Sequence, residues 1–157
     1  MNKTIKLLIF ATIGCTNLVS AQAGTTAVPA GKERISLAPI EINATMLVPQ
    51  GVKAIEETYS YYISGDNFVI SVESAYDMTL EKAKEDIAAD SNKKLIAATR
   101  HSVIYQETMM GKEMAHFESY FEVDGKFYRF YDKRVTPLTI EQITPMCDAV
   151  ETILPAQ

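Results

Sequence analysis

The sequence contains no tryptophan, two cysteines, two histidines and little glycine or proline, with 7 Gly and 6 Pro in 157 residues. With 47% hydrophobic and 22% charged residues, this composition excludes collagen-like, low-complexity and wholly disordered chains. Two cysteines are too few for a disulfide scaffold. Basic residues number 15 against 20 acidic ones, and the net charge of −5 argues against a general nucleic-acid binder. The length allows one domain, or two small ones.

The motifs of common catalytic and cofactor sites are also missing. There is no G-x-S-x-G, no glycine-rich phosphate loop and no H-E-x-x-H. His101 and His116 fall in different predicted strands and Cys147 is distant from both in sequence, so no pair has metal-ligand spacing. Cys147 is next to the apolar stripe of a predicted helix, which indicates a buried structural thiol rather than a nucleophile. We therefore assign no catalytic, cofactor-binding or metal-binding residue and predict that the protein is not an enzyme.

Residues 1–23 have the pattern of a secretory signal peptide. Lys3 and Lys6 precede a short apolar stretch from Leu7 to Gly14, and Ala21-Gln22-Ala23 is a small-x-small cleavage site. Cleavage after Ala23 would place the protein in the periplasm or outside the cell. Removing this segment takes away two lysines and no acid, so 13 basic and 20 acidic side chains remain and the net charge becomes −7.

An alternative for the same segment is lipidation of Cys15. Thr12-Ile13-Gly14-Cys15 resembles a bacterial lipobox, although Thr12 stands where a large aliphatic residue is usual. A lipidated Cys15 would make the mature protein an anchored envelope component. No apolar run after the cleavage site reaches the roughly 18 residues that a spanning helix needs, so the mature chain is predicted to lack a transmembrane segment.

Residues 24–34 lack apolar periodicity and are predicted to form a flexible lead-in, and residues 35–157 to form a single domain. Residues 35–49 are predicted to hold short extended pieces, which Pro39 breaks and places at a sheet edge or a strand boundary. Segments rich in β-branched and aromatic residues on both sides of Ser64–Asn67 predict a hairpin with its turn there. Period-3.6 patterns predict a helix capped by Thr79 and another that begins with the capping box at Thr139 and breaks at Pro145. The predicted strands after residue 57 are Thr58–Ser64, Asn67–Ala75, Ile96–Glu107, Glu113–Val123 and Lys126–Val135.

Asp124-Gly125 predicts a type I′ hairpin turn, which would pair Val123 with Lys126 and so fix the register of two strands. One face of this pair is then apolar. The other face is charged and aromatic, and we expect it to be half covered. The apolar face carries Ala115, Phe117, Phe121, Tyr128 and Phe130; the mixed face carries His116, Glu118, Tyr120, Glu122, Phe127, Arg129, Tyr131 and Lys133.

These elements predict an α+β fold in which two amphipathic helices sandwich one antiparallel twisted sheet. The element order, the strand end at Met46–Pro49 and the hairpin at Val123–Tyr128 resemble the Mog1/PsbP-like fold and, within it, the periplasmic family related to DcrB. The resemblance covers roughly residues 40–155. It implies a binding or accessory role and assigns no site residues.

Tyr120, Arg129 and Tyr131 on the mixed face are candidate partner-binding residues, because aromatic residues and Arg are favoured at protein interfaces. The alternative is that the final helix covers them. Met109 and Met110 at a predicted hairpin tip are further candidates for an exposed contact, and the alternative is that they fold onto the edge of the core.

The leading hypothesis is an exported bacterial envelope protein that binds another protein without catalysis. A specific version is a periplasmic immunity protein, whose negative charge would steer a basic toxin towards it. A second hypothesis is a small periplasmic enzyme or ligand-binding protein whose acidic residues converge in a cleft. A third is a lipid-anchored envelope component held by Cys15.

Overall fold

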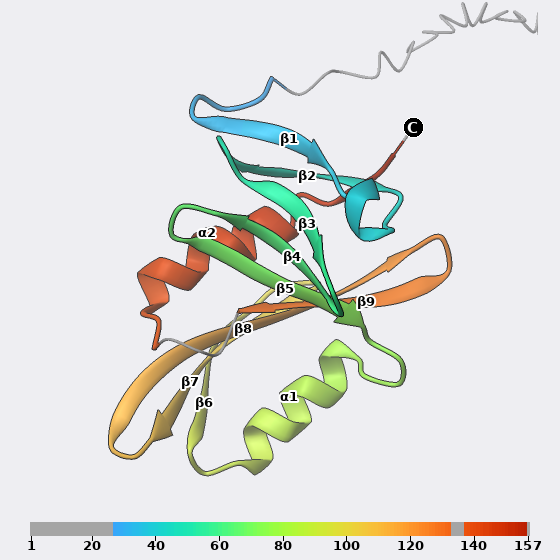
Figure 1. Ribbon diagram of the computed structural model, residues 1–157. Helices are drawn as coiled ribbons and strands as arrows, with labels where there is room; N and C mark the ends of the chain where they lie inside the picture. The colour runs from blue at the N-terminus through green and yellow to red at the C-terminus, as the bar shows by residue number, and fades with distance from the viewer. Residues whose placement is uncertain (1–26, 133–136, 157) are drawn as a thin grey trace, which may run out of the picture.

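The computed structural model describes residues 27–132 and 137–156, which form two antiparallel sheets and two α-helices (Figure 1). The predicted signal peptide, Cys15 and Lys133 lie outside the described residues. The larger sheet has the strand order β3-β4-β5-β9-β8-β7-β6 and the smaller one the order β1-β2-β10. The strands are β1 (Lys32–Ser36), β2 (Ala44–Pro49), β3 (Lys53–Glu57), β4 (Ser60–Gly65), β5 (Phe68–Ser74), β6 (Lys93–Ala98), β7 (Ser102–Met109), β8 (Lys112–Val123), β9 (Lys126–Asp132) and β10 (Leu154–Pro155).

The two helices lie on opposite faces of the larger sheet. Helix α1 (Leu80–Ala89) links β5 to the outermost strand β6 and packs against β6, β7 and β8. Helix α2 (Ile140–Val150) packs on the other face and also contacts β2, so it lies between the two sheets (Figure 1). A single turn of 3-10 helix, η1 (Ala38–Ile40), joins β1 to β2.

The predicted fold class, one sheet sandwiched by two helices, is wrong. The described residues are 51% strand and 19% helical, and they form two sheets, so the protein is mostly β. The chain before β3, which we expected to supply edge pieces, forms a separate sheet with β10. In β2, Ala44, Met46 and Val48 are buried in alternation, and they pack in one core with Ile143 and Val150 of α2. Helix α2 carries apolar side chains over more than one narrow stripe. The buried face of the smaller sheet supplies the second apolar surface that these side chains need.

The predicted helix starts are confirmed, but the predicted break at Pro145 is wrong. Thr79 caps α1 by accepting a hydrogen bond from the backbone N–H of Lys82 at 3.2 Å. Thr139 and Gln142 form the capping box of α2. Helix α2 then runs through Pro145 without interruption, because a proline at the sixth helical position removes one hydrogen bond and packing on both sides holds the helix together.

The prediction of a turn at Asp124-Gly125 gives the correct register. Val123 pairs with Lys126, and Asp124 and Gly125 both have positive φ, as the type I′ turn requires. The predicted strand Ile96–Glu107 is instead two strands, β6 and β7, which turn at residues 99–101. Strand β1 begins at Lys32, so the last three residues of the predicted lead-in are in a sheet.

Candidate functional site

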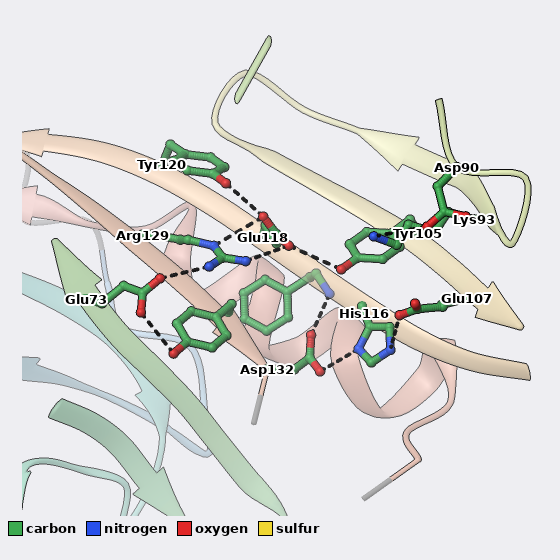
Figure 2. A network of polar contacts seen from close by, with 12 residues as sticks. Glu73, Asp90, Lys93, Tyr105, Glu107, His116, Glu118, Tyr120, Arg129 and Asp132 are labelled. Atoms are coloured by element: carbon green, nitrogen blue, oxygen red, sulfur yellow. Dashed lines mark hydrogen bonds and ion pairs between the residues drawn. The ribbon is translucent and has the colours of Figure 1, made fainter. Parts of the chain in front are cut away.

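The side of the larger sheet that faces α1 carries a chain of hydrogen-bonded charges (Figure 2). Its centre is the buried carboxylate of Glu118 on β8. This carboxylate accepts hydrogen bonds from the hydroxyls of Tyr105 at 3.2 Å and Tyr120 at 2.8 Å. It also pairs with Arg129 of β9, whose Nη2 lies 2.7 Å from Oε1 and whose Nε lies 3.2 Å from Oε2. Each Glu118 oxygen therefore has both a tyrosine and the guanidinium as partners.

Arg129 extends this network towards solvent. Its Nη1 lies 2.8 Å from Oε1 of Glu73 on β5, and the Tyr131 hydroxyl donates to the other oxygen of Glu73 at 3.2 Å. The guanidinium also lies over the Tyr131 ring, 4.5 Å from its centroid. Burial by itself would lower the pKa of Arg129, but hydrogen bonds and charge from Glu118 and Glu73 outweigh it and raise the pKa. Arg129 is thus a fixed cation.

Two tyrosines of the network, Tyr120 and Tyr131, are held as neutral donors. Burial raises the pKa of Tyr120 well above its ordinary value, and the negative charge of Glu118 adds to the effect. Burial and then the charge of Glu73 raise the pKa of Tyr131 in the same way.

A second polar cluster surrounds His116, deeper in the sheet. Nδ1 of His116 lies 2.8 Å from Oδ2 of Asp132, and Oδ1 of Asp132 accepts from the backbone N–H of Phe117 at 2.9 Å. Nε2 of His116 lies 3.5 Å from Oε2 of Glu107 (Figure 2). The imidazole is almost fully buried, so this cluster ties β7, β8 and β9 together rather than presenting a group to solvent.

A cleft of about 580 Å³ opens where β4 begins and β5 ends, beside the outer end of the network. Its walls come from the β3–β4 turn and from the β5–α1 loop. Six residues that line it carry aromatic rings or charges: Tyr59, Tyr61, Glu73, Tyr76, Asp77 and Arg129. A smaller hollow of about 90 Å³, which shares Tyr59 and Glu73, extends it to Tyr62 and Tyr131.

Two of these tyrosines are almost entirely exposed. Tyr59 in the β3–β4 turn has 98% of its surface accessible, and Tyr76 in the β5–α1 loop has 87%. Tyr76 also has φ of 46°, a left-handed conformation that favours Gly or Asn and costs a bulky residue energy. Neither ring adds to the core, so folding does not account for a tyrosine at these positions.

The structure divides the predicted partner-binding residues between three environments. Tyr120 is buried against α1 and is not a surface residue, whereas Arg129 lines the cleft and Tyr131 lines its extension. The helix that covers part of the mixed face is α1, not the final helix that the alternative named. Met109 and Met110 are 51% and 97% exposed, so they project from the β7–β8 hairpin and do not fold onto the core. They are remote in sequence and register from the cleft.

Sequence reasoning missed Tyr59, Tyr76 and Glu73. Tyr59 was assigned to a strand, but β4 begins at Ser60 and leaves Tyr59 in the turn. The sequence offered one signal, namely tyrosines next to residues that are common in turns. Tyr59 lies between Thr58 and Ser60, and Tyr76 lies between Ala75 and Asp77.

The remaining sequence predictions concern Cys147, metal binding and membrane-spanning helices. Cys147 is buried as predicted, and burial raises the pKa of its thiol to about 11. Across residues 27–132 and 137–156, no three His, Cys, Asp or Glu side chains are placed to hold a metal ion. Neither α1 nor α2, the two α-helices in that part of the chain, is long and apolar enough to cross a membrane.

No protein-family model, curated protein or solved structure matches this chain. The resemblance to the DcrB-related family therefore stays a prediction, and the site has to be interpreted from its own geometry.

Proposed function

We propose that this protein is an exported binding protein of the bacterial envelope, without catalytic activity, and that it binds another protein through the cleft between Tyr59 and Tyr76. The observation that carries the proposal is the pair of exposed tyrosine rings that line the cleft together with charged side chains. Tyrosine supplies a large contact area with little loss of side-chain entropy and is enriched where proteins bind partners. A periplasmic immunity protein is one role that fits this arrangement.

The network behind the cleft supports a binding role. Both Glu73 oxygens accept hydrogen bonds, from Arg129 and from Tyr131, so the carboxylate is held in one place before any partner arrives. A side chain fixed in advance loses little entropy on binding. The proposal thus explains why charged groups are fixed at the edge of a cleft.

The enzyme hypothesis has one observation in its favour, since Glu73 and Asp77 both line the cleft. Glu73, however, is engaged with Arg129 at 2.8 Å and with Tyr131, which suits a fixed acceptor better than a group that exchanges protons with a substrate. The lipid-anchored form is compatible with the same cleft. The mass of the mature protein distinguishes an N-terminus at Gly24 from a lipidated Cys15.

Site-specific photocrosslinking in the cells that make the protein tests the proposal. A benzoylphenylalanine at position 59 or 76 should yield one discrete crosslinked species, which mass spectrometry would identify. The matched control places the same group at Leu154, which is 54% exposed on the smaller sheet. A species seen equally at all three positions, or at none, would contradict a binding site in the cleft. A fourth variant with the group at position 110 probes the methionine tip, and crosslinking from that position alone would contradict the cleft and move the site to the tip.

A further inference from the structure

The charges around the cleft do not balance. Among the described residues that line it, Glu73 and Asp77 are acidic and Arg129 is basic. Each of the three guanidinium nitrogens already lies within 3.2 Å of a carboxylate oxygen. Two carboxylates and one guanidinium that is already paired give these lining residues a net negative charge, and a partly enclosed site strengthens that field. This favours a cationic group over an anionic one.

The two exposed tyrosines add a second preference for a cation. The face of an aromatic ring is negative, so rings on two sides of a site attract an ammonium or guanidinium group. Tyr59 comes from the β3–β4 turn and Tyr76 from the β5–α1 loop, and both line the cleft. The same chemistry already operates within the protein, where the Arg129 guanidinium lies over the Tyr131 ring. The rings and the carboxylates thus select the same class of ligand.

We propose, resting on the binding role above, that the cleft receives a lysine or arginine side chain of a protein partner. The cation would lie between the Tyr59 and Tyr76 rings and pair with the outer face of the Glu73 carboxylate, which is 45% exposed. The mature chain, with 13 basic and 20 acidic side chains, would steer a basic partner towards the cleft over a longer range.

A labelled hexa-arginine peptide, followed by fluorescence anisotropy, tests this assignment directly. The double variant Tyr59→Ser/Tyr76→Asn keeps every charge and gives position 76 a residue that accepts positive φ, so it should fold as the original protein does. Losing two cation–π contacts should weaken peptide binding about tenfold. Glu73→Gln should weaken it by a similar factor, because the carboxylate that pairs with the guanidinium is gone.

Matched controls separate the cleft from general charge attraction. Glu85→Gln removes one exposed acid from α1, and Met110→Ser removes the most exposed apolar side chain of the β7–β8 hairpin. Both should change the affinity by less than about twofold, because exposed charges outside the site are screened by salt. A hexa-glutamate peptide should not bind detectably.

Two results would overturn the assignment. One is that hexa-arginine binds the cleft variants and the control variants with the same affinity, and the other is that hexa-glutamate binds the protein as tightly as hexa-arginine does. These failures are distinguishable from failure of the binding role itself. If a partner crosslinks at position 76 but hexa-arginine binds the cleft variants as tightly as the original protein, the cleft is still the binding site and the assignment of a basic side chain is wrong. Absence of any crosslink at positions 59 and 76 would reject the site.

Discussion

Both faces of the larger sheet bury an apolar cluster, but the α1 face adds a buried charged network around Glu118, although the same strands supply both faces. On the α2 face, Phe117, Phe130 and Ile70 are fully buried among apolar neighbours. On the α1 face, Glu118 and His116 are almost as deeply buried, but each is surrounded by polar partners. In β8 the side chains alternate between the two faces: Ala115, Phe117 and Phe121 pack in the α2-side core, whereas Glu118 and Tyr120 lie on the α1 side.

Apolar burial stabilises the fold, whereas the charged network positions the groups that we propose for binding. Apolar burial against α2 and the smaller sheet is favourable without any matching of individual groups. Buried charges lose their hydration and are stable only while every partner is in place. Burying the charged network on the α1 face carries this free-energy cost. The network also fixes Arg129 and Glu73 at the edge of the cleft.

The largest expected effect comes from the apolar face. Phe117→Ala removes a fully buried ring from the core that α2 shares with both sheets, and should lower the free energy of unfolding by about 3–5 kcal/mol. Urea unfolding followed by circular dichroism measures it. A loss below about 1 kcal/mol would show that this face does not dominate stability.

A single break in the network should cost nearly as much. Arg129→Met removes the guanidinium that pairs with the buried Glu118 carboxylate at 2.7 Å, and should lower the free energy of unfolding by about 3 kcal/mol. The double variant Glu118→Gln/Arg129→Met removes both charges, while the Gln oxygen can accept from one tyrosine hydroxyl and the Gln NH2 can donate to the other. It should recover at least half of that loss. If the double variant is as unstable as the sum of its single changes, the network does not act as a unit.

Alkaline pH should destabilise the protein through groups on both faces, by less than either of the substitutions above. Burial raises the pKa of Cys147 from 9.0 to about 11, so the unfolded chain loses this proton first. Stability should therefore fall as the pH rises above 9, by about 2 kcal/mol near pH 11. Tyr120 and Tyr131 have raised pKa values too and add a loss of the same sign above pH 10. Cys147→Ala should abolish the part that begins at pH 9; an unchanged profile would contradict the assignment to the thiol.

The smallest effect on stability should have the opposite sign. Tyr76→Gly relieves a left-handed backbone and removes a ring that buries almost nothing, so it should leave stability unchanged or raise it by up to about 1 kcal/mol. The same change should weaken partner binding. Clear destabilisation in thermal unfolding would mean that the ring serves the fold.

The sequence predicts local features well because short-range physics determines them. The Asp124-Gly125 turn fixed the pairing of Phe121 with Tyr128, and the Thr79 and Thr139 caps located both helix starts. The alternation in β8 also predicted which residues face the core, Phe117 among them.

The sequence could not predict features that depend on contacts between distant segments. Pairing of Leu154 with Thr45 in a second sheet joins residues at opposite ends of the chain, and it led to the wrong fold class. The cleft has the same origin, because the β3–β4 turn brings Tyr59 to a loop that contains Tyr76. Arg129 and Tyr131 were found because they shared a predicted face, whereas no local pattern connected them to Glu73.

The most direct test of the account combines stability and binding in one variant. Tyr59→Ser/Tyr76→Asn is titrated with hexa-arginine and unfolded in urea beside the original protein. The account predicts that affinity falls about tenfold while the free energy of unfolding does not decrease. Unchanged affinity, or an affinity lost only in proportion to stability, would contradict a binding site built from the exposed tyrosines.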